Sequence, residues 1–157
     1  VIEDYTPGSL GWVCGLQAEY YARAWGFNRA FEAKITREMG AFMATFDAEK
    51  DLFQIIKKGN TVTGSIVLDS TDSVVAHLRW FFVDDSVRGL GLGSLLLSNA
   101  ITFARSHHFE SVYLWTFDGL NEARHLYEKA GFRLIHSEEG ENWGKKVIEQ
   151  KFELLLH

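Results

Sequence analysis

Hydrophobic and polar positions follow a helical periodicity in the first third of the chain. Apolar and aromatic side chains recur every three or four residues, which predicts one helix over about 17–25 and a second from Asn28 to about Phe46. Asn28 is a favourable N-cap, and Glu32 stands in the first turn, where its charge suits the helix dipole. The second helix should bury Phe31, Ile35, Met39, Phe42 and Phe46. Before these helices we expect an irregular lead-in over residues 1–10 and a short strand over 11–14.

From residue 52 the sequence pattern becomes typical of β-strands. Segments 52–57 and 61–68 are apolar and β-branched, and the Lys58-Gly59-Asn60 turn between them predicts a hairpin. The longest predicted strand covers 74–83. Strict alternation would place Ala76, Leu78, Trp80 and Phe82 on one face and His77, Arg79, Phe81 and Val83 on the other.

The rest of the chain alternates between helical and strand-like patterns. It predicts a helix over about 93–105, a buried strand over 111–117 and a helix capped by Asp118 that ends at Ala130, with Gly131 as a left-handed stop. Two closing strands follow, over about 132–137 and 147–156. This order predicts a mixed α/β (α+β) fold: a mixed sheet flanked by helices.

Composition narrows the class of protein. The 157 residues, 46% hydrophobic and 24% charged, predict a single folded domain over residues 1–157. A net charge of −5 argues against direct nucleic-acid binding. Cys14 is the only cysteine, which excludes an internal disulfide and a cysteine-based zinc site, so no metal is expected. Without a secretory signal or a long apolar run, we expect a soluble cytoplasmic protein that does not enter a membrane.

The strongest candidate chemistry is the glycine-rich segment from Arg88 to Ser94, which lies between a predicted strand and a predicted helix. Glycines expose backbone N–H groups, a helix N-terminus attracts anions, and Arg88 adds a positive charge, so the segment predicts a phosphate or pyrophosphate site. A plain packing turn is the ordinary alternative. The spacing fits neither the G-x-G-x-x-G dinucleotide pattern nor a Walker loop, which needs a lysine.

Two motifs together carry a family resemblance. Arg88-x-x-Gly91-x-Gly93 after a strand resembles the coenzyme A pyrophosphate motif of the GCN5-related N-acetyltransferases, the GNAT superfamily. The later run from Asn121 to Phe132, which contains Leu-Tyr-Glu-Lys-Ala-Gly-Phe, is similar to the second signature of that family. The resemblance implies the GNAT fold: about six to seven strands, splayed between the fourth and fifth, with about four helices.

The resemblance also implies acetyl-CoA as the acetyl donor, with no metal, and assigns residues to it. Those implied to hold the cofactor are Phe82, Val83, Arg88, Gly89, Gly91, Gly93, Ser94 and Asn121. Tyr127 is implied as the general acid that protonates the leaving thiolate; the alternative is a buried ring in the core. The predicted long strand carries no acidic residue, so His77 is the candidate base there, although a lone strand histidine is more often structural.

Candidates for the acceptor site are less constrained. Arg79 can anchor a carboxylate or form an internal ion pair, and Glu32 can meet an amine or merely match the helix dipole. Trp115 is grouped with the acceptor site. The N-terminal helical region is rich in aromatic residues: Trp12, Tyr20, Tyr21, Trp25, Phe27 and Phe31. We expect most of them to pack in the core and some to line the acceptor pocket.

The expected activity is acetyl transfer to a primary amine, of a small molecule such as an amino acid. The alternatives are a protein lysine or N-terminal amine as acceptor, a non-catalytic acyl-CoA sensor, and a nicotinamide enzyme. Gly11-Trp12-Val13, Phe31-Glu32-Ala33 and Leu114-Trp115-Thr116 more weakly resemble the acetyltransferase domain fused to winged-helix regulators of the MarR type, and a chain starting at Val1 fits such an origin. Family habit implies a homodimer.

Overall fold

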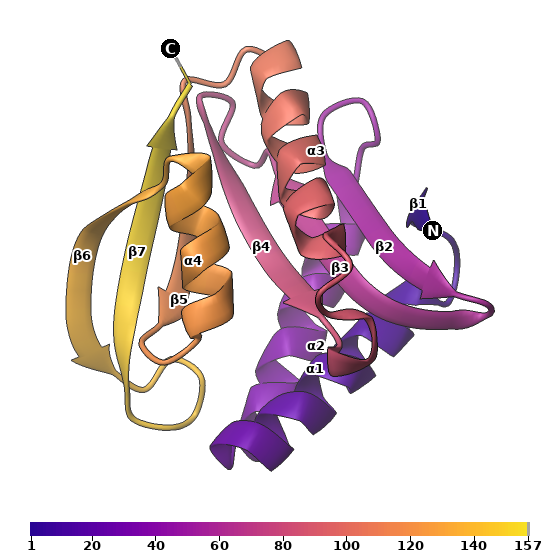
Figure 1. Ribbon diagram of the computed structural model, residues 1–157, viewed down its shortest axis with the longest axis vertical. Coiled ribbons are helices and arrows are strands. Elements are labelled where there is room, and N and C mark those ends of the chain that lie inside the picture. The colour runs from indigo at the N-terminus through magenta and orange to yellow at the C-terminus, as the bar shows by residue number, and fades with distance from the viewer. Residues whose placement is uncertain (157) are drawn as a thin grey trace.

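The computed structural model describes residues 1–156, which form a sheet with helices on both faces (Figure 1). The strands are β1 (Ile2–Asp4), β2 (Leu52–Lys58), β3 (Thr61–Asp69), β4 (Val75–Val83), β5 (Ser111–Phe117), β6 (Arg133–Gly140) and β7 (Val147–Leu155). The helices are α1 (Ser9–Trp25), α2 (Arg29–Ala44), α3 (Leu92–Ser106) and α4 (Asn121–Ala130), with a short 3₁₀ turn at Asp85–Val87.

The sheet divides between β4 and β5. Its strand order is β1-β2-β3-β4-β5-β7-β6, and β4 and β5 are its parallel neighbours. These two strands pair only from Val75 to His77 on β4, opposite Ser111 to Tyr113 on β5. Beyond those residues they separate, so the predicted splay and the mixed α/β fold are confirmed.

Two hydrophobic cores hold the layers together. On one face, α3 buries Leu96, Leu97, Ala100 and Ala104 against β3, β4 and β5, with Tyr127 of α4 in the same cluster. On the other face, α2 buries Phe31, Ile35, Met39 and Phe42, as the helical spacing predicts, together with Val13 and Cys14 of α1. Figure 1 shows α4 in front of β5 and β7, α3 in front of β3 and β4, and α1 and α2 behind the sheet.

The N-terminal prediction was wrong in two places. Residues 11–14 are part of α1, not a strand, because Val13, Cys14 and Gln17 share the helical face that packs on α2 and the sheet. The lead-in contains a strand: Ile2–Asp4 pairs antiparallel with β2, from Ile2 opposite Ile56 to Asp4 opposite Gln54. Three residues carry too short a pattern to reveal a strand in the sequence.

The predicted alternation along β4 was also wrong, because the strand contains a β-bulge. Trp80 has a positive φ of 48°, and the register against β3 slips between Arg79 and Phe82. The Trp80 carbonyl accepts a hydrogen bond from Ser65 Oγ at 2.7 Å. Two consecutive side chains therefore face α2: Arg79 bonds Glu38 and Trp80 packs on Phe42. Phe81 turns to the α4 side instead.

The last helix starts later than predicted. Asp118 does not cap it; α4 begins at Asn121 after a turn in which Gly119 has φ 112°. A Cβ at Gly119 would lie 2.2 Å from the Trp25 ring, so this turn is shaped by close packing against α1. Gly131 ends α4 in the left-handed conformation, as predicted. Within residues 1–156, none of the helices combines the length and apolar character needed to cross a lipid bilayer.

Candidate active site

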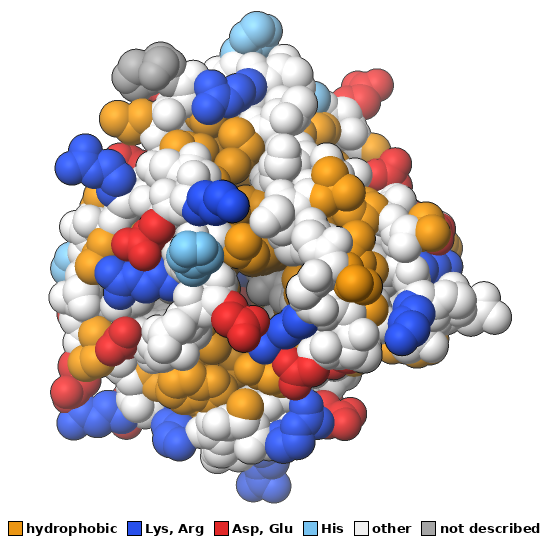
Figure 2. Space-filling view, viewed as in Figure 1, with side chains coloured by type: hydrophobic (Ala, Val, Ile, Leu, Met, Phe, Trp, Pro, Cys, Tyr) orange, Lys and Arg blue, Asp and Glu red, His pale blue; other side chains and the backbone are white. Residues whose placement is uncertain are grey.

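The separation of β4 and β5 opens a cleft of about 1160 Å³ through the middle of the molecule. One mouth opens between α3 and α4, where Figure 2 shows the surface hollowed, with acidic and basic side chains at its rim. From there the cleft runs beneath α1 and α2 toward β5, β6 and β7. We call its two parts the glycine-loop end, around Arg88 to Ser94, and the acceptor end, around Trp80, Trp115 and Glu149.

The glycine-loop end has the conformation of an anion site. Gly89 and Gly91 take positive φ angles of 79° and 76°, which favour glycine, and no atom would obstruct a side chain at either. The first helical bond of α3 runs from Leu95 N–H to Gly91 O, so the preceding N–H groups lack helical partners. Gly93 has a packing role: a Cβ there would lie 3.2 Å from Leu126. The packing-turn alternative therefore applies to Gly93.

Arg88 lies beside this loop and forms two ion pairs and one hydrogen bond. Its guanidinium lies 2.9 Å from Asp85 and 3.3 Å from Glu122, and Nε donates to the Val83 carbonyl at 3.1 Å. Both carboxylates are largely exposed, so each pair contributes little to stability. The guanidinium is available to an anion that enters the cleft.

The free edge of β4 runs along the cleft. Phe82 and Val83 pair with Ser65 and Gly64 of β3 on one side only, because β5 leaves β4 after His77. Their other side faces the gap, and both residues line the cleft, as do Ser94 and Asn121. This edge can accept an extended polar chain as an additional strand.

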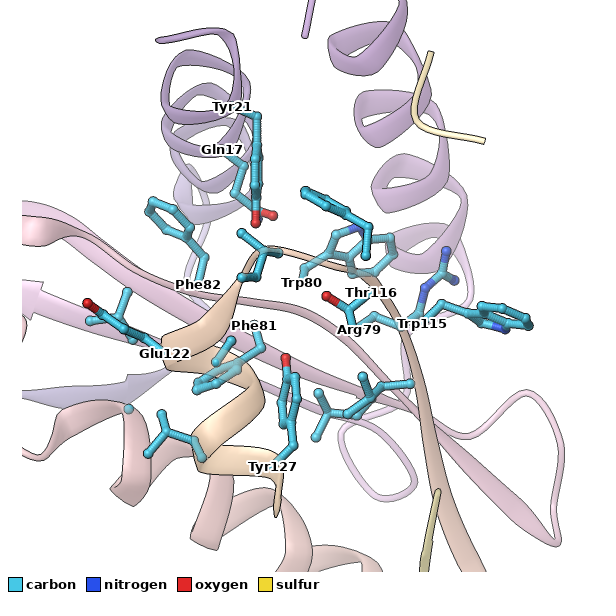
Figure 3. A pocket seen from close by; sticks show the side chains of 18 of the residues that line it. Gln17, Tyr21, Arg79, Trp80, Phe81, Phe82, Trp115, Thr116, Glu122 and Tyr127 are labelled. Carbon is cyan, nitrogen blue, oxygen red and sulfur yellow. The ribbon is translucent and has the colours of Figure 1, made fainter. Parts of the chain in front are cut away.

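Tyr127 points its hydroxyl into the cleft from α4 (Figure 3). Its ring packs on Phe81, Phe132 and Phe152, and the residue is 5% exposed. Tyr21 points toward it from α1 on the opposite wall (Figure 3). Burial raises the pKa of both phenols, so both remain protonated donors.

His77 lines the cleft where β4 and β5 part, but its environment suits packing better than proton transfer. The imidazole stacks on Tyr113 with ring centroids 4.4 Å apart. Burial, with the Arg79 and Lys151 charges nearby, lowers the pKa of His77 to about 3. A general base works best with a pKa near the operating pH, so the structure favours the structural alternative.

At the acceptor end, the ion-pair interpretation of Arg79 holds. Its guanidinium contacts Glu38 at 2.9 Å and Asp69 at 3.2 Å, and Lys34 also pairs with Glu38. Arg79 therefore has no free charge for a substrate carboxylate. Trp115 lines the cleft. Of the two interpretations of Glu32, the structure favours the match to the helix dipole: this residue lies exposed in the first turn of α2, and it is not among the residues that line the cleft.

Sequence reasoning missed several residues of the cleft. Gln17 is 4% exposed, and its Nε2 has no hydrogen-bond partner among the described residues. Glu149 is 3% exposed, lines the cleft and is held by Asn142. The spacing of Gln17 and Tyr21, four residues apart on α1, was the available signal. The place of Glu149 depends on the pairing of β7 with β5, which no local pattern reveals.

Comparison with known families decides what this cleft belongs to. The family described as "Acetyltransferase (GNAT) family" matches residues 16–132, well over half of the chain. The chain belongs to the GNAT family of acetyltransferases. As a GNAT protein it is an acyltransferase that uses acetyl-CoA as acetyl donor. No curated protein sequence matches it significantly.

Solved structures share the GNAT fold over their whole length. A GNAT-family acetyltransferase of Staphylococcus aureus is 19% identical, with 100% of this chain and 99% of that chain covered and a TM-score of 0.78. A ribosomal-protein-alanine N-acetyltransferase of Brucella melitensis is 14% identical, with 99% of both chains covered and a TM-score of 0.77. YncA of Salmonella typhimurium, solved with its cofactor acetyl-CoA, is 15% identical, with 100% and 94% covered and a TM-score of 0.73.

Proposed function

We propose that this GNAT protein transfers the acetyl group of acetyl-CoA to the primary amine of a small molecule. The observation that carries the proposal is a single cleft that joins a glycine-rich anion site to an aromatic end, with a phenol between them. The first end suits the pyrophosphate of coenzyme A, and the second suits a small acceptor.

The residues at the glycine-loop end fit coenzyme A. The N–H groups that precede Leu95, together with Arg88, would hold the pyrophosphate. The free edge of β4 at Phe82 and Val83 would bond the pantetheine arm, with Asn121 on the facing side. Gly89 and Gly91 keep this wall free of side chains.

When bound, acetyl-CoA supplies an acetyl group activated as a thioester. The acceptor ammonium first loses one proton to water. Its neutral nitrogen then forms an amide bond as the carbon–sulfur bond breaks, and its second N–H proton goes to the sulfur, so that coenzyme A leaves as the thiol. Tyr127 would donate a hydrogen bond to the departing sulfur, which its protonated state supports. The walls of the cleft contribute mainly by positioning the two reactants.

The loop between β6 and β7 supports a small acceptor over a protein lysine or N-terminus. Lys145 of this loop donates to the Trp25 carbonyl at the end of α1, at 2.6 Å. Trp143 packs on Phe117 with ring centroids 5.5 Å apart, and a Cβ at Gly144 would lie 3.1 Å from Ala30. The loop therefore packs against the end of α1 and the start of α2 at the acceptor end, which favours a small acceptor over a polypeptide.

A panel of primary amines tests the proposal. Release of free coenzyme A thiol should exceed background hydrolysis with at least one small amine, whereas peptides with a free lysine or N-terminus should be poor acceptors. Tight acetyl-CoA binding without turnover of any amine would instead favour a non-catalytic acyl-CoA sensor. Faster turnover of the peptides would contradict a small-molecule acceptor.

A further inference from the structure

Aromatic side chains dominate the acceptor end of the cleft. Four of the five tryptophans of the chain line the cleft: Trp25, Trp80, Trp115 and Trp143. Phe31 and Phe117 line it as well, and Phe117 packs on Trp25 and Trp143. Of the described tryptophans, Trp12 is the one outside the cleft, 45% exposed on α1. Such a surface recognises a planar apolar group by stacking and an organic cation by cation–π attraction.

The two cations that line this end, Arg79 and Lys34, are already paired with carboxylates. Arg79 lies between Glu38 and Asp69, and Lys34 pairs with Glu38. Lys151 holds its ammonium over the rings of Tyr113 and Trp115, at 4.8 and 5.7 Å, and does not line the cleft. At the acceptor end, Arg79 and Lys34 therefore offer no unpaired positive charge to a carboxylate.

Two carboxylates make the acceptor end acidic. Glu138 and Glu149 are directly opposite each other on β6 and β7, and both line the cleft. Like charges in such a pair repel unless a cation lies near them. Asn142 holds Glu149 through two hydrogen bonds, of 2.9 and 2.7 Å, while Glu138 has His136 at 3.3 Å. Gly140 leaves room for the Glu149 carboxylate, since a Cβ there would lie 2.5 Å from it.

Gln17 is an independent sign that a ligand completes this cleft. Its amide Nε2 is buried without a partner among residues 1–156, and Figure 3 shows the side chain beside Tyr21, pointing into the cavity. A buried amide donor without a partner is unfavourable, and a bound molecule can remove that cost. Gln17 and Tyr21 are neutral donors, so they add no charge that would attract a carboxylate.

We infer that the acceptor is an arylalkylamine without a carboxylate: the aromatic group lies against the tryptophans, and Glu138 and Glu149 attract the ammonium. This inference rests on the proposed function and narrows its acceptor class. It disfavours the free amino acids that the sequence alone suggested.

Calorimetry on the full chain saturated with coenzyme A tests the inference, with tryptamine, tryptophan and hexylamine as ligands. Tryptamine should bind about tenfold or more tightly than either of the others, because tryptophan adds a carboxylate and hexylamine lacks the ring. Equal or tighter binding of tryptophan would overturn the inference, as would equal binding of hexylamine or no binding of tryptamine.

Three variants locate the preference. Glu138→Gln, at an exposed position, should reduce the ratio of the tryptamine affinity to the tryptophan affinity by about threefold or more. Trp115→Ala should weaken the binding of tryptamine but not that of hexylamine. Trp12→Ala, which removes a tryptophan outside the cleft as a matched control, should change the affinity of neither amine. If both tryptophan variants behave alike, the binding site is not this one.

Turnover separates this inference from the proposed function. The predicted binding order without acetyl transfer to any amine would support the ligand class and contradict the proposed function. Transfer to tryptophan in preference to tryptamine would support the function and overturn the inference.

Discussion

A tyrosine hydroxyl in an apolar cleft keeps its proton over the pH range in which most proteins remain folded. Burial raises the pKa of Tyr127, and its ring is fixed by three aromatic neighbours. Tyr127→Phe keeps those ring contacts and removes only the donor. We expect turnover to fall about tenfold or more, with acetyl-CoA affinity unchanged. Steady-state kinetics with direct binding of acetyl-CoA checks this, and unchanged turnover would exclude Tyr127 as the acid.

His77 makes a prediction about stability instead of catalysis. Its pKa is lowered to about 3 by burial, from 6.5 for a free histidine. The neutral side chain therefore contributes stability that is fully present above pH 6.5 and is lost as the pH falls toward 3, because the unfolded chain takes up a proton first. Between pH 7 and pH 5 this loss should be about 2 kcal/mol.

The variant His77→Phe preserves the stack on Tyr113 and removes the titration. Its free energy of unfolding, from urea titrations at pH 7 and pH 5, should fall by about 2 kcal/mol less than that of the parent chain over this interval. Equal losses in both chains would mean that His77 titrates normally in the folded protein.

Residue roles were predictable from the sequence where a motif fixed them. Arg88, Gly91 and Tyr127 all reach the cleft as expected. The sequence does not decide whether Arg79 anchors a substrate or forms an ion pair, because its partners, Glu38 and Asp69, come from different elements. Only the fold brings those two carboxylates to one guanidinium.

At the scale of elements, the glycine loop and the first turn of α4 have opposite effects on phosphate binding. Arg88, beside the loop, contacts Glu122 of α4 at 3.3 Å, so this carboxylate competes with any phosphate for the guanidinium. Arg88→Gln should weaken acetyl-CoA binding about tenfold, or about 1.4 kcal/mol, whereas Glu122→Gln should strengthen it by about threefold.

Glu128→Gln is the matched control for this pair of effects. Glu128 lies on the same helix and pairs with Arg124 at 3.6 Å, outside the cleft. Direct titration of the three variants with acetyl-CoA measures all the changes. A loss of affinity in Glu122→Gln would mean that this carboxylate assists binding instead of competing.

Most elements were predictable from periodicity because each one buries a regular stripe or face. The β4 bulge was not, because alternation has no means to register one additional residue; its cause is the slip against β3 and the positive φ of Trp80. The α1 start was missed for a different reason. Gly11 and Gly15 have low helix propensity, although a Cβ at either position would meet nothing within 4 Å.

At the scale of the whole molecule, the cleft is a product of topology. The separation of β4 from β5 creates its length, and the β6–β7 loop bridges back to Trp25 across the acceptor end. Motifs predicted the glycine-loop end, since those residues are close in sequence. The acceptor end joins α1, α2, β4, β5, β6 and β7, so its acidic and aromatic character emerged only from the fold.

The most direct test of the central claim follows the acetyl group itself. The full chain is incubated with acetyl-CoA carrying a deuterated acetyl group and with a panel of small amines, and the products are analysed by mass spectrometry. We predict an amide that carries the labelled acetyl group on a small amine, formed in equal amount to free coenzyme A. Labelled acetate alone, or intact acetyl-CoA despite saturated binding, would contradict the account.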